Sequence, residues 1–145
     1  MTHIIKAYVA LPVSAVQVKL QLHLTEEGML RAAFPSGEVE GREISYAHFC
    51  DLPVQVEGSP FQKRVWAAVC RIPRGETRSY QWVANKIERA HDVRAVARAI
   101  GANPILVRIP CHRVIYASGA LGGFAFGKHL KKVLLGWEGV LDFVD

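Results

Sequence analysis

The stretch "SPFQKRVWAAVCRIPRGETRSYQWVANKIERAHDVRAVARAIGAN" (59–103) contains three successive apolar patterns with the spacing of α-helices. Ser59 followed by Pro60 is typical of a helix start, because a serine hydroxyl caps free N–H groups and proline suits the first helical position. The segment "IPRGE" (72–76) ends this first helix. The apolar residues at helical spacing are Phe61, Val65, Ala68, Val69 and Ile72.

Two shorter helices are predicted after this break. One begins near Ser79, and Asp92 is expected to cap another that runs to about Gly101. Two short helices joined by a tight turn, after a longer supporting helix, are typical of a helix-turn-helix. The first of the two carries Tyr80, Val83, Ala84 and Ile87 at helical spacing.

The last of these helices has two different faces when it is plotted at about 100° per residue. Its predicted outer face holds Arg94 and Arg98 among alanines, with no bulky side chain. Such a shallow face lets a helix approach a surface closely, and the minor groove of DNA, about 6 Å wide, requires this. The predicted inner residues are Val93, Val96, Ala97 and Ile100, and the predicted outer ones are Arg94, Ala95, Arg98, Ala99 and Ala102.

The region before residue 58 shows strand patterns instead. The segment "VQVKLQLHL" (16–24) alternates strictly, as a half-buried strand does, with Val16, Val18, Leu20, Leu22 and Leu24 on one face. After "TEEG" (25–28), a second strand is predicted through Leu30, Ala32 and Phe34. Residues 4–10 suggest a further strand and 42–51 a short helix, so we expect a small antiparallel sheet.

A linker over 51–59 divides the chain into an N-terminal α/β lobe, residues 1–57, and a second domain, residues 58–145. The first part has four Lys/Arg against seven Asp/Glu, and the second has fourteen against six. The net charge of +5 therefore arises entirely from the second part, which suggests a polyanionic partner.

Cysteine usage and hydropathy exclude several classes. Cys50, Cys70 and Cys111 are far apart and form no C-x-x-C pair, which argues against a disulfide scaffold and against a zinc site. A reducing compartment fits free thiols, so we expect a cytoplasmic protein, or a nuclear one in a eukaryote. Pro12 interrupts the apolar run 4–16, which favours a strand over a signal peptide, and no run is long enough for a membrane span.

The segment "IPCHRVI" (109–115) places a thiol beside an imidazole. Neighbours on an extended chain point to opposite faces, so Cys111 and His112 can cooperate only through a bend or a bridging water. A glycine-rich loop (117–127) follows, which could close over a flat ligand. The segment 128–143 is predicted to be an amphipathic helix, with Glu138 near its end and Leu130, Val133, Leu134, Trp137 and Leu141 facing inward.

Four motifs together resemble the O6-alkylguanine-DNA alkyltransferases, over about residues 58–140: "GETRSYQWVA", "RAVARAIGAN", "GANPI" and "PCHRV". The resemblance implies a mixed α/β (α+β) protein, with a small RNase H-like N-terminal lobe that contains a β-sheet. A mostly helical, winged helix-turn-helix-like C-terminal domain would follow it.

The resemblance also implies roles in the reaction. Cys111 is similar to the cysteine that accepts the alkyl group, His112 to the base that acts through a water, and Glu138 to the carboxylate that orients this histidine. Asn103 matches the asparagine that braces the turn before the cysteine, and Tyr80 the phenol that donates toward guanine N3 and rotates the target phosphate.

Further residues would contact the substrate and the DNA. Lys131 would polarise the guanine O6, the carbonyls of Cys111 and Val114 would read the guanine amino group, and Arg94 would enter the base stack. Phe124 and Ala125 stand where many relatives have Tyr and Ser, so loop hydroxyls are missing. The DNA-binding residues implied in this way are Arg94, Ala95, Arg98 and Arg113.

The implied function is DNA repair: a monomer without metal or cofactor would bind the minor groove of double-stranded DNA and flip out O6-alkylguanine. It would then move the alkyl group irreversibly to Cys111, acting once. A soft thiolate suits displacement at carbon, although a free thiol, with a pKa of about 8.5, needs activation. Three alternatives remain. The presence of Cys111 argues against a non-catalytic alkyltransferase-like protein, and the shallow helix face argues against a helix-turn-helix regulator. The adjacency of Cys and His argues against a thiol hydrolase or redox enzyme.

Overall fold

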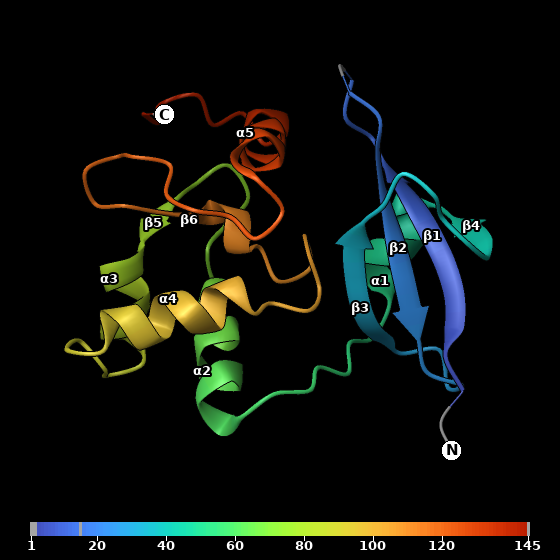
Figure 1. Ribbon diagram of the computed structural model, residues 1–145, viewed down its shortest axis with the longest axis horizontal. Coiled ribbons are helices and arrows are strands. Elements are labelled where there is room, and N and C mark those ends of the chain that lie inside the picture. Colours follow the sequence, from blue (N-terminus) through green and yellow to red (C-terminus); the bar gives the residue numbers. More distant parts are fainter. Residues whose placement is uncertain (1–2, 15, 145) are drawn as a thin grey trace. The chain divides into compact units, whose positions relative to one another are not determined.

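The computed structural model describes residues 3–14 and 16–144, and the contacts within the chain divide it into two compact units (Figure 1). The first contains the residues up to Glu57 together with Pro104–Arg108, and the second contains Gly58–Asn103 and the residues from Ile109 on. The predicted division at 57/58 does not include this short returning segment. The N–H of Ala33 donates to Pro104 O at 3.0 Å and that of Leu106 to Ala33 O at 3.0 Å, so the segment extends the sheet of the first unit.

The first unit is a four-stranded sheet in the order β3-β2-β1-β4, with α1 packed on β1. Its elements are β1 (Ile5–Leu11), β2 (Val18–Leu24), β3 (Leu30–Pro35), β4 (Arg42–Ile44) and α1 (Tyr46–Asp51). The expected antiparallel sheet is a mixed one, because β4 pairs parallel to β1. The helix predicted over 42–51 is also too long at its start, since Ser45 caps α1 through its hydroxyl and residues 42–44 are a strand.

The alternation predicted for β2 is observed, but that for β3 is not. Val18, Leu20, Leu22 and Leu24 are buried, whereas Val16 lies before the strand and is 40% exposed. In β3 the buried residues are Leu30 and Ala33, and Ala32 and Phe34 are only half-buried. The cause is a shift in register opposite His23 and Leu24, which places an additional residue in β3 and inverts the alternation.

The second unit confirms the three predicted helices and adds a two-stranded sheet that the sequence analysis missed. Its elements are α2 (Pro60–Val69), β5 (Arg78–Ser79), α3 (Tyr80–Lys86), α4 (Val93–Gly101), the 3-10 turn η1 (Cys111–Arg113), β6 (Val114–Ile115) and α5 (Lys128–Trp137). Ser59 and Gln62 form a capping box at the start of α2. The strands β5 and β6 pair in parallel, which places the start of α3 beside the chain that leaves Cys111.

Two expectations for α4 were wrong. Asp92 lies at the N-cap but makes no side-chain cap, because its carboxylate accepts hydrogen bonds from Arg89 instead. Ala99, predicted on the outer face, is 4% exposed and faces α2, where the indole N–H of Trp66 donates to Ala99 O at 2.8 Å. Arg94 and Arg98 are exposed as predicted.

The last helix is shorter than predicted, and the way in which it ends determines the position of Glu138. Gly139 adopts a left-handed conformation with φ 83°, its N–H donates to Gly136 O at 3.0 Å, and that of Val140 donates to Leu135 O at 2.9 Å. This is a Schellman motif, which ends α5 at Trp137 and leaves Glu138 as its C-cap. Leu141, predicted to face inward, is therefore 80% exposed, and the buried residues of α5 are Lys131, Leu134 and Leu135.

The helices of the described residues are short, and α2 and α5 each have ten residues. A transmembrane helix needs about 20 apolar residues. None of the helices formed by residues 3–14 and 16–144 has the length and apolarity to cross a membrane.

Candidate active site

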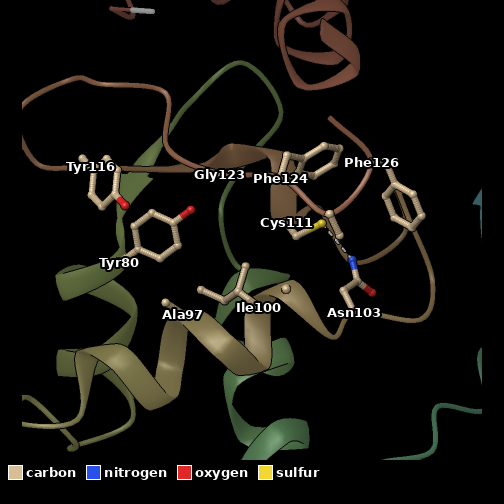
Figure 2. Close-up of a pocket in the computed structure, with 11 residues that line it drawn as sticks. Tyr80, Ala97, Ile100, Asn103, Cys111, Tyr116, Gly123, Phe124 and Phe126 are labelled. Carbon is tan, nitrogen blue, oxygen red and sulfur yellow. Dashed lines mark hydrogen bonds between the residues drawn. The ribbon is translucent and has the colours of Figure 1, made fainter. Parts of the chain in front are cut away.

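A cavity of about 280 Å³ lies within the second unit and reaches Cys111 (Figure 2). Residues of α3, α4, the segment after η1 and the glycine-rich loop form its wall. The lining residues are Tyr80, Ala97, Ile100, Gly101, Asn103, Cys111, Tyr116, Gly123, Phe124, Ala125 and Phe126. Four predicted site residues are therefore brought together with the cysteine: Tyr80, Asn103, Phe124 and Ala125.

Cys111 and His112 lie in a 3-10 turn and not on an extended chain. The N–H of Cys111 donates to Ile109 O at 2.8 Å and that of Arg113 to Pro110 O at 2.9 Å. Successive residues of such a turn are rotated by about 120°, so the two side chains need not point in opposite directions. The turn supplies the bend that cooperation of the two residues requires.

Asn103 holds the turn and the thiol together. Its Nδ2 donates to Ile109 O at 2.7 Å and to Cys111 Sγ at 3.0 Å (Figure 2). The carbonyl acceptor fixes the orientation of the amide, because only the nitrogen can donate. Burial raises the pKa of the Cys111 thiol to about 11, although the Asn103 bond and the positive charge of Lys131 oppose this shift. The thiol is therefore protonated at neutral pH.

His112, the neighbour of Cys111 in the 3-10 turn, forms a buried pair with Glu138. His112 Nε2 lies 3.1 Å from Glu138 Oε1, and both side chains are almost completely buried. Neither ring nitrogen makes a well-aligned hydrogen bond within the described part of the chain. Burial lowers the pKa of His112 although Glu138 opposes the shift, so the imidazole is neutral and can accept a proton.

The carboxylate of Glu138 is ionised in spite of its burial. Burial alone would raise its pKa, but the hydrogen bonds from Arg113 and the close approach of the His112 imidazole hold the pKa at about 2. Arg113 donates through Nε to Oε1 at 2.9 Å and through Nη2 to Oε2 at 2.6 Å. Arg74 Nη1 lies 3.7 Å from Oε2, with its guanidinium over the Trp137 ring. One carboxylate thus faces two guanidiniums and an imidazole.

Arg113 makes its observed contacts within the second unit, and its contact with DNA stays a prediction. Besides the two bonds to Glu138, its Nη1 donates to Ile72 O at 2.7 Å, so the guanidinium bridges two parts of the second unit. A bidentate pair with a buried carboxylate is strong, and a phosphate would have to break it. Arg113 is therefore a residue that positions Glu138.

Tyr80 is the first residue of α3, and its ring projects toward the middle of the cavity (Figure 2). Ser79 accepts a hydrogen bond from the N–H of Trp82 and caps the helix. The ring packs against Gly122, where a Cβ would lie 3.1 Å from the phenol oxygen. Burial, with a smaller contribution from Tyr116, raises the pKa of Tyr80 to about 12. The hydroxyl is therefore a neutral donor.

Lys131 Nζ lies 5.9 Å from the ring centroids of Tyr80 and Phe124, two residues of the cavity wall, and its role toward the guanine O6 stays a prediction. Its ammonium is fully buried and donates to Val114 O at 2.7 Å, Leu121 O at 2.6 Å and Gly123 O at 3.3 Å. Neither Lys131 nor Val114 lines the cavity. Because three carbonyls accept its three N–H groups, Lys131 joins β6 to the glycine-rich loop. Burial lowers the pKa of Lys131 to about 8.

Sequence reasoning missed several cavity residues, above all Tyr116. It is a lone aromatic residue between the β6 strand and a glycine-rich loop, and this composition was the available signal. Tyr116 also lines a second groove of about 400 Å³, together with Arg94 and Ala97 of α4. Ala95 is half-buried beside Arg94, and the contacts of Arg94, Ala95 and Arg98 with DNA stay predictions.

A helix-turn-helix unit with a cavity that reaches a buried cysteine defines a DNA-binding class of protein with one candidate nucleophile. The chain belongs to the 6-O-methylguanine DNA methyltransferase family: the family description "6-O-methylguanine DNA methyltransferase, DNA binding domain" matches residues 60–140. The matched residues include α2 to α5 and the PCHR turn.

Individual relatives agree with this assignment. The chain is 49% identical over 100 residues to the inducible methylated-DNA–protein-cysteine methyltransferase of Bacillus subtilis. This alignment covers 69% of this chain and 54% of that protein. A crystal structure of Mycobacterium tuberculosis OGT in complex with DNA has a TM-score of 0.72 at 31% identity, over 91% of this chain and 92% of that one. S. pombe Atl1 in complex with DNA containing O6-carboxymethylguanine has a TM-score of 0.53 at 29% identity, over 59% of this chain and 81% of that one. The chain spans about half the length of the curated relatives it matches.

Proposed function

We propose that this protein repairs O6-alkylguanine in double-stranded DNA by transferring the alkyl group to Sγ of Cys111, as a methylated-DNA–protein-cysteine S-methyltransferase. The observation that carries the proposal is the position of this thiol in the wall of a cavity, with Asn103 bonded to its sulfur. The buried His112–Glu138 pair supports it, because the pair is chemically fitted to remove a proton. Relatives named for this reaction support it further.

The reaction balances without a cofactor. The sulfur lone pair forms the S–C bond, the C–O6 bond breaks, and its electrons remain on the guanine. The thiol loses one proton and the guanine gains one. The thioether that forms is a poor leaving group, so we expect one turnover for each protein molecule.

Activation of the thiol is the first requirement. With a pKa of about 11, roughly one Cys111 in ten thousand is ionised at pH 7. Neutral His112 would accept the proton through a bridging water, and ionised Glu138 would stabilise the imidazolium that forms. Arg113 would keep the carboxylate ionised and oriented.

Protonation of the leaving group is the second requirement. The Tyr80 hydroxyl, a neutral donor at the middle of the cavity, would donate toward guanine N3 as negative charge develops on the base. Phe124 and Ala125 would flank the base, and the carbonyl of Cys111 would accept from its amino group. The carbonyl of Val114, which already accepts from Lys131 and lies outside the cavity lining, would have to turn toward the base to do the same. Lys131 would act indirectly, through the position of Val114 and the loop.

The alkylated atom is inaccessible inside a duplex, so the nucleotide must be flipped out, at a cost of a few kcal/mol. The shallow face of α4 would enter the minor groove, with Arg94 in the base stack and Arg98 and Ala95 against the backbone. We expect a monomer, and because its substrate would be DNA and its three cysteines form no disulfide, we place it in the cytoplasm or the nucleus.

The direct test is to incubate the protein with duplex DNA that contains one O6-methylguanine. The proposal predicts a mass increase of one methylene for each protein molecule, located in the Cys111 peptide, and unmodified guanine in the DNA. Tight binding of the damaged duplex without any mass increase would instead indicate a non-catalytic alkyltransferase-like protein.

A further inference from the structure

Two hollows of the second unit meet at the same three residues. The cavity that reaches Cys111 and the outer groove that reaches Arg94 share Tyr80, Ala97 and Tyr116. A ligand that extends from the thiol into the outer groove would pass between these side chains. Ala97 offers only a methyl group there, and Tyr80 projects inward (Figure 2). Tyr116 is therefore the large side chain on the outer side of the passage.

The ring of Tyr116 is held in position while much of it remains open. Two hydrogen bonds hold the turn that follows β6: Tyr116 N donates to Ala120 O and Gly119 N donates to Tyr116 O, both at 2.9 Å. Its ring centroid lies 5.3 Å from that of Tyr80, at an interplanar angle of 46°. The residue is nevertheless 54% exposed. A fixed, solvated aromatic surface at a passage is suited to bind an apolar ligand face.

The chemistry of the substrate indicates what lies at this passage. In the proposed reaction the guanine base occupies the inner cavity with its alkyl group at Cys111, while the phosphates stay with the duplex at the α4 face. The deoxyribose joins the two, and the direct path between the two hollows runs between Ala97, Tyr80 and Tyr116. One face of a deoxyribose carries C–H groups, which pack well against an aromatic ring.

We propose that Tyr116 is a specificity-determining residue whose ring packs against the deoxyribose of the flipped nucleotide. This inference rests on the proposed function and adds a preference to it: the protein reads the sugar as well as the base. The ring is the operative group, since contact with C–H groups needs no hydroxyl. Arg94 differs, because it would act only where a base stack exists.

The test compares three substrates with the same alkyl group, methyl or benzyl, whichever the parent takes faster: the free O6-alkylguanine base, its 2′-deoxynucleoside and the duplex. Tyr116→Ala should lower the ratio of nucleoside rate to free-base rate by about 3- to 10-fold, the range expected for one aromatic contact. Tyr116→Phe should keep the parental ratio. Arg94→Ala serves as the contrast, because it should lower the duplex rate and leave the nucleoside-to-base ratio at the parental value.

Each other result has a definite meaning. If Tyr116→Ala slows the base and the nucleoside equally, the residue acts through Tyr80, and the inference is wrong. It is also wrong if only the duplex rate falls, which would indicate contact with another nucleotide, or if Tyr116→Phe behaves like Tyr116→Ala. If Tyr116→Ala loses its native circular dichroism, Tyr116→Leu, which retains apolar bulk, takes its place. If the parent protein reacts with none of the three substrates, the proposed function itself is wrong. If the parent reacts but Tyr116→Ala leaves the nucleoside-to-base ratio unchanged, only the inference about Tyr116 is wrong.

Discussion

The two units differ in what they bury. The first buries an apolar core and two polar side chains, Gln21 and Thr25, and the amide of Gln21 is fully bonded to backbone groups of Ala7 and Glu40. The second buries Cys111, Asn103, His112, Lys131 and Glu138, of which four are titratable with displaced pKa values. Burying ionisable groups is unfavourable, and such groups cluster where chemistry is performed. The buried titratable groups of the described residues thus lie in the second unit, where the proposed reaction would take place.

The largest effect is expected when proton removal is impaired. His112→Ala should slow alkyl transfer at pH 7 by about 100- to 10,000-fold, the usual contribution of a general base. Because the pKa of Cys111 is about 11, the thiolate fraction rises about tenfold for each pH unit up to that value. The rate of the variant should therefore recover toward alkaline pH more steeply than that of the parent. Parallel pH–rate profiles would contradict the relay through His112.

A smaller effect is expected for the residue that would fill the base stack. Arg94→Ala should slow repair of the duplex by roughly 100-fold, since flipping costs a few kcal/mol, but should react with free O6-benzylguanine nearly as the parent does. Arg94→Lys should rescue poorly, because an ammonium cannot stack.

The neighbouring Arg98 is the matched control for this prediction. Arg98→Ala should mainly weaken DNA binding and reduce the slope of log affinity against log salt by about one. An equal loss on duplex and free base in Arg94→Ala would instead assign that arginine a structural role.

The next prediction concerns the loss of folding stability at acid pH that the buried Glu138 of the second unit should cause. The pKa of Glu138 is about 2 in the folded protein against a usual value near 4.5. A lowered pKa stabilises the folded state above pH 4.5, and this stabilisation is lost as the pH falls toward 2. Parent unfolding free energy should drop by up to about 3 kcal/mol across this window beyond the drop seen in Glu138→Gln. Urea unfolding at pH 6, 4 and 2 measures it, and identical pH curves would show that the ion pair with Arg113 adds no acid-labile stability.

The smallest effect on repair is expected from the polar group of the first unit. Gln21→Leu leaves Glu40 N and Ala7 O without their side-chain partner, which should cost about 1–3 kcal/mol of stability. Its rate of alkyl transfer, measured where both proteins are folded, should equal that of the parent. A selective loss of transfer would show that the first unit takes part in the reaction.

Local patterns predicted local structure and failed where distant residues decide. Ser59, Pro60 and the apolar spacing were enough for α2, because caps and periodicity lie within a few residues. The parallel pairing of β4 with β1 depends on residues about 35 positions apart, and nothing in "REI" (42–44) indicates it. The turn at Cys111 was foreseen only as one of two alternatives.

For the site residues, too, the sequence predicted what local motifs determine but not what depends on distant segments. The motifs predicted which residues gather at the cavity, and Asn103, Tyr80 and Cys111 do so. They did not predict where long cationic side chains point. Lys131 turns to three carbonyls and Arg113 to Glu138, because a buried cation must find acceptors within reach, and those acceptors come from other segments of the fold.

The most direct test of the central claim uses the three cysteines. Cys111→Ala, Cys50→Ser and Cys70→Ser are compared with the parent for methyl transfer from O6-methylguanine duplex and for affinity to the same DNA. The account predicts no transfer but near-parental affinity for Cys111→Ala, since the buried thiol contributes little to binding, and one methyl group per molecule for the other two. Stoichiometric repair by Cys111→Ala would contradict the assignment of the nucleophile.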